Sequence, residues 1–205
     1  MAGTEIPKPK LYRLYQIENV AERILKDTDE YFTGYRFDIE SFITGKHGLI
    51  IDVHYHLKAN HDTWAYMLIN SNRIFVDNQL IDNDRLEKKF RFTIGEEFAH
   101  YLIHRDVFAG CSTLEKRNRR YFSFSEIERK YIENNARALA AALLMPKGMV
   151  EDRVSQMLNG IETYSENIID TLAQQIAHDF DVNFTAARSR LKMLGYHNRL
   201  KPDID

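Results

Sequence analysis

The sequence predicts an α+β fold that is mostly helical, with a small, mainly antiparallel three-stranded sheet and a C-terminal helical region. Over most of the chain, apolar residues recur at the 3.6-residue spacing of amphipathic helices. Runs rich in β-branched and aromatic residues, which are typical of strands, gather between residues 49 and 76. Because only about three strands are evident there, the sheet is expected to be short and to lie along one side of the helices.

The N-terminal part is predicted to be a tail followed by two helices. Residues 1–10 contain two of the four prolines and are expected to form a flexible tail. Apolar residues at helical spacing predict a packing helix over residues 11–26. A short second helix over Asp38–Thr44 is expected to end at Gly45, since glycine is common just after a helix C-terminus.

The strand candidates follow one another directly in the sequence. They are Leu49–Leu57, Thr63–Ile69 and Arg73–Val76. Asn70–Asn72 suits a tight turn between the last two, because Asn and Ser side chains hydrogen-bond to nearby backbone groups. The three segments therefore predict the small sheet.

The longest predicted helix comes after the sheet. Asp82 or Asn83 suits its N-cap, and the helical spacing continues to about His104. Residues 106–120 are polar and are predicted to form a loop. The longest helix is therefore expected to end in front of a polar connection.

The remaining helices have clear boundary signals. Ser125 and Glu128 have the spacing of a capping box, so a helix is expected to begin there, and it must end before Pro146. Three further helices are predicted over Gly148–Leu158, Asn167–Asp179 and Phe184–Leu194. The last two have the outline of a helix–turn–helix.

One face of the longest helix carries ionisable side chains. Glu96, His100 and His104 lie at positions i, i+4 and i+8, and therefore on the same face. Neighbouring positions are apolar, and burying unpaired charge is costly, so a bound metal ion would explain this face. A second interpretation remains open: Thr93 and Glu96 have capping-box spacing, in which case Glu96 only fixes a helix start.

The spacing is that of the H-E-x-x-H motif, with Glu96 in place of the first His. In the intact motif both His residues bind zinc and the Glu acts as a general base. Together, Arg91–His104 (RFTIGEEFAHYLIH) and Glu133–Pro146 (ENNARALAAALLMP) resemble the ImmA/IrrE family of zinc metallopeptidases, over about residues 15–196. Arg137 and Leu139 depart from the pattern, which has Asn and Phe at these positions.

The resemblance implies a zincin-like metallopeptidase domain over residues 11–146, with a C-terminal helical region, residues 147–205, packed on it. The missing side chain of Gly95 would leave room beside the metal ion. Arg73–Val76 would be the edge strand beside the active helix, to which a substrate adds as a further strand.

The resemblance also implies a set of site residues. Glu96, His100 and Glu133 would bind the metal, Zn²⁺ or another divalent ion such as Mn²⁺, because carboxylate and imidazole groups ligate such ions. Glu97 would be the general base that takes a proton from the metal-bound water during peptide hydrolysis. His104 would either contact a metal-binding residue without binding the metal itself, or be a structural residue.

The implied function is a metal-dependent endopeptidase that cuts one specific protein partner. Family members of this type often cleave a helix–turn–helix transcriptional repressor, in mobile elements or in stress responses. The loss of the first His keeps an alternative open, namely a catalytically inactive relative that binds a repressor or antitoxin without cutting it. Direct DNA binding through Arg188, Arg190 and Lys192 is a third possibility, but we expect these residues to form a solvated face.

Composition narrows the classes of protein to which the chain can belong. The formal net charge is only −2, which argues against binding to nucleic acids or other polyanions. Cys111 is the sole cysteine, so an internal disulfide is excluded and a reducing cytosol fits. The N-terminus lacks the apolar stretch of a signal peptide, and the apolar run Ala138–Met145 is too short to span a membrane. We therefore expect a cytoplasmic protein without membrane contact.

Overall fold

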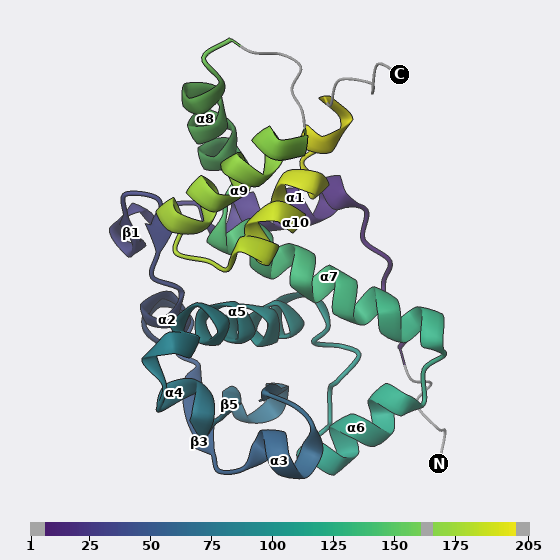
Figure 1. Ribbon diagram of the computed structural model, residues 1–205. Helices are drawn as coiled ribbons and strands as arrows, with labels where there is room; N and C mark the ends of the chain where they lie inside the picture. The colour runs from purple at the N-terminus through teal and green to yellow at the C-terminus, as the bar shows by residue number, and fades with distance from the viewer. Residues whose placement is uncertain (1–6, 161–165, 200–205) are drawn as a thin grey trace.

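The computed structural model describes residues 7–160 and 166–199 and confirms the mostly helical α+β fold (Figure 1). Its long helices are α1 (Leu14–Ile24), α5 (Glu87–Ile103), α7 (Glu126–Leu144), α8 (Lys147–Leu158), α9 (Glu166–Asp179) and α10 (Phe184–Met193). Helix α7 crosses the middle of the molecule, with α1 and α8–α10 on one side and α5 on the other. The sheet lies beyond α5.

Some predicted segments reach beyond the described residues. Residues 1–6 of the predicted tail lie outside the described residues. So do residues 161–165 and 200–205 of the predicted C-terminal region. Within the described part of the chain, no helix is both long and apolar enough to cross a bilayer.

The helix starts follow local capping chemistry. The capping box predicted at Ser125 is present: the Ser125 hydroxyl accepts from the Glu128 N–H, and the Glu128 carboxylate accepts from the Ser125 N–H. Asn83 accepts from the Arg85 N–H and starts a 3₁₀ turn that leads into α5. Since α5 begins at Glu87, Thr93 lies in its interior. The interpretation of Thr93 and Glu96 as a helix-starting capping box is therefore wrong.

The sheet contains β3 (Ile50–His54), β4 (Ala65–Leu68) and β5 (Arg73–Asp77), in the order β3-β5-β4. Strand β4 is antiparallel to β5, as expected for two strands joined by a tight turn, whereas β3 is parallel to β5. The prediction that Arg73–Val76 forms an edge strand is therefore wrong. Sequence spacing predicts the β4–β5 hairpin but cannot show that β3 pairs with the far side of β5.

Short elements surround the sheet. They are the β1–β2 hairpin (Phe32–Thr33 and Arg36–Phe37), α2 (Ile39–Ser41) with a π turn after it (Phe42–Lys46), α3 (Leu57–His61) and α4 (Asn78–Ile81). The helix predicted over Asp38–Thr44 is thus split between an α turn and a π turn. Apart from α3, these elements share one hydrophobic core with α1, α5 and α7–α10, while Leu57 of α3 packs in a second, smaller cluster with Tyr66, Leu68 and Leu114.

A helix occupies most of the predicted loop over residues 106–120. This helix, α6 (Leu114–Phe122), begins at Thr113, whose hydroxyl accepts from the Lys116 N–H. Five of its nine residues are charged, so it lacks the apolar spacing that reveals a buried helix. The loop prediction is therefore wrong for residues 114–120, and the correction matters because α6 contributes side chains to the site.

Helices α5 and α7 pack closely where Gly95 faces Ala140. A Cβ atom added to Gly95 would lie 3.0 Å from Ile39 Cδ1 and 3.5 Å from Ala140 Cβ. The space left by the missing side chain is therefore filled by these two residues, and does not open beside a metal ion as predicted. The close approach brings the polar residues that follow Gly95 next to those of α7.

Buried ion pairs connect the C-terminal helices to the rest of the fold. The fully buried Arg190 donates two hydrogen bonds to the Glu18 carboxylate and one to the Met145 carbonyl, the latter at 3.0 Å. Arg188 pairs with Asp170 at 2.7 Å. The predicted solvated face is therefore wrong for Arg190, and these contacts do not favour the DNA-reading interpretation.

Candidate functional site

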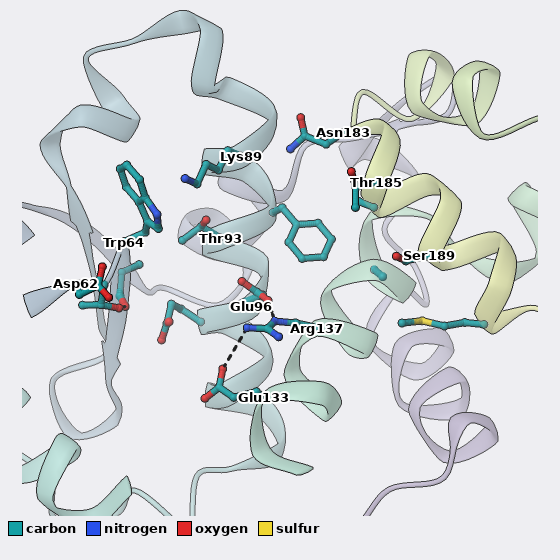
Figure 2. A pocket seen from close by; sticks show the side chains of 17 residues that line it. Asp62, Trp64, Lys89, Thr93, Glu96, Glu133, Arg137, Asn183, Thr185 and Ser189 are labelled. Carbon is teal, nitrogen blue, oxygen red and sulfur yellow. Dashed lines mark hydrogen bonds and ion pairs between the residues drawn. The ribbon is translucent and has the colours of Figure 1, made fainter. Parts of the chain in front are cut away.

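The predicted site residues meet where α5 packs against α7. Helix α5 supplies Glu96, Glu97 and His100, and α7 supplies Glu133 and Arg137. Arg137 Nε donates to Glu96 Oε1 at 3.0 Å, and Arg137 Nη2 lies 4.0 Å from Glu133 Oε2. One guanidinium group therefore joins the carboxylates of two helices (Figure 2).

The pKa of Glu96 is raised to about 7. Burial is the largest cause, because it disfavours the charged form, while Arg137 acts in the opposite direction. The neighbouring charges of Glu97 and Glu133 raise the pKa further. Glu96 therefore keeps its proton to a higher pH than an exposed glutamate does, and its ionised form is the one that Arg137 stabilises.

Glu97 is buried on the other side of the same turn. Its Oε2 atom lies 3.5 Å from Arg117 Nη2 of α6, and its carboxylate accepts a hydrogen bond from the Met67 backbone of β4. Burial raises the pKa of Glu97, and Arg117 opposes that rise. The side chain proposed as a general base thus connects α5 with α6 and with the edge strand.

His100 and His104 form a neutral pair at the end of α5. Their Nδ1 atoms are 3.0 Å apart, so one ring donates to the other. Burial, followed by the charge of His104, lowers the pKa of His100 well below its usual value. Burial, followed by Arg117, lowers the pKa of His104 to about 4. His104 is also completely buried, and its Nε2 atom has no hydrogen-bond partner among the described residues.

Cavities open beside these residues, and two of them include Glu97 in their lining. The larger, of about 520 Å³, lies between β4, α5 and α10, and Figure 2 shows Trp64 and Lys89 on one wall and Thr185 and Ser189 on the opposite wall. A smaller cavity of about 350 Å³ lies towards α6 and is lined by residues that include His100, Arg117 and Tyr121. Glu97, Glu133 and Arg137 line both cavities.

The donor side chains of the site do not converge on one point. Among the described residues, no three His, Cys, Asp or Glu side chains lie where they could share one ion. Glu96 is bound by Arg137 and Glu133 is hydrogen-bonded by the Tyr121 hydroxyl, so both carboxyl groups of the predicted ligand set are already engaged. His100 is bonded to His104 through its Nδ1 atom only, which by itself would not prevent metal binding. As arranged, these residues do not fit a bound metal ion. Their assignment as ligands stays a prediction, as does that of Glu97 as the base.

Sequence reasoning missed three side chains of this site: Arg117, Tyr121 and Arg137. Arg137 had a visible signal, because it departs from the Asn of the family pattern. Arg117 lay within the predicted loop, and Tyr121 is the first residue after the end of that loop. Only the folded position of α6 shows that they contact the glutamates.

Comparisons with known proteins agree with the motif resemblance. A family model described as IrrE N-terminal-like domain matches residues 48–192. No curated protein matches the chain. A solved structure of a Mycobacterium tuberculosis transcriptional regulator is similar, with a TM-score of 0.54 and 15% identity, over 90% of this chain and 48% of that chain. This chain thus spans about half the length of that protein, and the likeness shows a shared fold alone.

Proposed function

Because the chain belongs to the family of IrrE N-terminal-like domains, we propose that it acts on a protein partner, a polypeptide segment of which it binds in the larger cavity beside α5. The observation that carries this proposal is the cavity itself. Its volume of about 520 Å³ lies within the roughly 300–1,000 Å³ of typical ligand sites.

The lining of this cavity suits a peptide. Trp64, Phe92 and Met193 offer apolar surface, while Thr93 and Ser189 offer hydroxyl groups. Ala65, the first residue of the edge strand β4, also lines the cavity, so a bound segment can approach the beginning of this strand. Part of this edge is already used, because the Thr63 hydroxyl donates to the Ala65 carbonyl and Met67 is bonded to Glu97.

The partner class that we propose is a helix–turn–helix repressor. The proposal rests on the family resemblance in the motif residues, which implies regulation through one protein partner. The fold shared with a protein described as a transcriptional regulator agrees with a regulatory role. The partner would be a separate chain that offers an extended segment to the cavity.

Metal-dependent endopeptidase activity is the second candidate function. It is favoured by the position of Glu97, a buried carboxylate with a raised pKa in the place that the motif gives to the general base. It also requires that Glu96 exchange its contact with Arg137 for a metal ion. The two candidates differ in whether the bound segment is cut.

Selection from a displayed library of random peptides tests the proposal. A fluorescently labelled peptide selected on the wild-type protein is expected to bind the Ser189→Trp variant at least about tenfold more weakly, since an indole group fills the cavity from the exposed side of α10. The control is Lys192→Trp, on the same helix and exposed, which is expected to bind normally. Equal affinity of the Ser189→Trp variant, or a failure to select any peptide, would contradict the proposal. Mass spectrometry of the bound peptide then separates binding from cleavage.

A further inference from the structure

We infer that Arg137 takes the place of the catalytic metal ion: its guanidinium group binds Glu96, stands beside Glu133 and excludes zinc, so the chain binds its partner without hydrolysing it. The exclusion of zinc stands on the geometry of the charged cluster alone. Only the statement about the partner rests on the proposed function.

The first argument is the position of the guanidinium group. Arg137 lies one turn after Glu133 on α7 and reaches across to α5, where it donates to Glu96 Oε1 at 3.0 Å. A zinc ion bound to the same oxygen would need to lie at about 2.0–2.2 Å from it and share it with further donors. The space between Glu96 and Glu133 that such an ion needs is the space in which the Arg137 side chain lies (Figure 2).

The second argument is the charge of the cluster. Three carboxyl groups, those of Glu96, Glu97 and Glu133, meet two guanidinium groups, those of Arg117 and Arg137. The Arg117–Glu97 pair is largely buried, with 12% and 10% of the side chains exposed. A divalent cation added here would lie beside fixed positive charges, and like charges at close range repel each other. The arginines therefore supply the positive charge that a metal ion would supply.

The third argument is that two of the departures from the family motif, Glu96 and Arg137, contact each other. The pattern has His where this chain has Glu96, and Asn where it has Arg137. A carboxylate and a guanidinium group form a strong charge-assisted hydrogen bond, which neither replacement would make alone. The pair thus converts a ligand position into one half of an ion pair. It also connects α5 with α7 without a metal ion.

The test is a zinc competition titration against a chromophoric chelator, with circular dichroism as the check of folding. Wild type is expected not to compete for zinc. The double variant Glu96→His/Arg137→Asn, which restores both motif residues, is expected to take up one zinc ion per chain and to bind it at least about 100-fold more tightly than wild type. Glu96→His/Arg137→Lys keeps a cation at the site and is expected to stay free of zinc.

Lys130→Asn is the matched control, since Lys130 is an exposed cation on the same helix that pairs with Glu126. This variant should behave as wild type does. Uptake of one equivalent of zinc by wild type would overturn the inference. So would equal zinc affinity of the Lys-containing and Asn-containing double variants, or a folded Asn-containing variant that binds no zinc.

Should the double variants not fold, the melting temperature of wild type provides a second measurement. A ligand that binds only the folded state raises the melting temperature. Because wild type is expected to exclude zinc, its melting temperature should be the same in EDTA and in excess zinc. A rise in zinc would overturn the inference. None of these measurements uses a peptide, so failure of the proposed partner binding can be told apart from failure of this inference.

Discussion

Replacing Glu96 with Gln tests the electrostatics of the cluster through the pH dependence of stability. The pKa of Glu96 is raised to about 7 in the folded protein, against an ordinary glutamate value of 4.5. Between these pH values the folded state holds a proton that the unfolded state has lost. The free energy of unfolding that Glu96 contributes is therefore fully present below about pH 4.5, and is lost as the pH rises through 7.

The size of the effect follows from the same values. At about 1.4 kcal/mol per pH unit, the interval from 4.5 to about 7 corresponds to at most about 3 kcal/mol. The Glu96 side chain is 25% exposed, and water there reduces the cost of the charge, so we expect about 1–3 kcal/mol. Gln is nearly isosteric and stays neutral, so Glu96→Gln should be more stable than wild type by this amount at pH 8, and about equally stable near pH 4.

The assay is urea unfolding of both proteins at intervals between pH 4 and pH 8. The difference between them cancels the contributions of the other titrating residues of the site. Glu126→Gln is the control, because Glu126 is an exposed residue of α7, and its difference from wild type should stay small at every pH. A Glu96→Gln variant that is less stable than wild type at pH 8 would refute the reasoning, and would show that Arg137 stabilises the ionised carboxylate by more than burial destabilises it.

Two further predictions concern other charged residues. Glu18→Gln should lower the free energy of unfolding, measured by urea denaturation, by about 3–5 kcal/mol. The reason is that the substitution leaves the buried Arg190 without its carboxylate. The double variant Glu18→Leu/Arg190→Met should recover most of this loss, and a double variant as unstable as the single one would show that the ion pair is not the cause. Glu97→Gln should leave the affinity for a selected peptide within about threefold, since Gln has nearly the same shape in the cavity lining and the carboxylate is already bonded within the protein. Any cleavage that wild type shows should stop in this variant, and cleavage at the wild-type rate would remove Glu97 from the reaction.

Local signals in the sequence predicted much of the scaffold. The capping box at Ser125 predicted the start of α7, because it depends only on residues three apart. The helical spacing of Glu96, His100 and His104 predicted that they share a face, and the structure brings the two histidines into contact. The order of the strands was missed, because pairing between distant segments depends on the whole fold.

The chemistry of the site could be predicted only in part. The family resemblance grouped Glu96, Glu97, His100 and Glu133, and in the structure all four line the two neighbouring cavities beside α5 and α7. The motif could not predict which positively charged side chains contact these four residues. Arg117 reaches the site from a helix that has no apolar pattern, at a separation of 20 residues from its partner Glu97.

Binding of a selected peptide in the presence and absence of metal tests the central claim most directly. The dissociation constant would be measured by calorimetry in EDTA and in excess zinc, and the peptide would then be examined by mass spectrometry after prolonged incubation. We expect the same affinity in both solutions and an intact peptide, because the cluster of glutamates carries its own cations, Arg117 and Arg137. Binding that requires zinc, or a peptide cut in the zinc solution and intact in EDTA, would contradict the account.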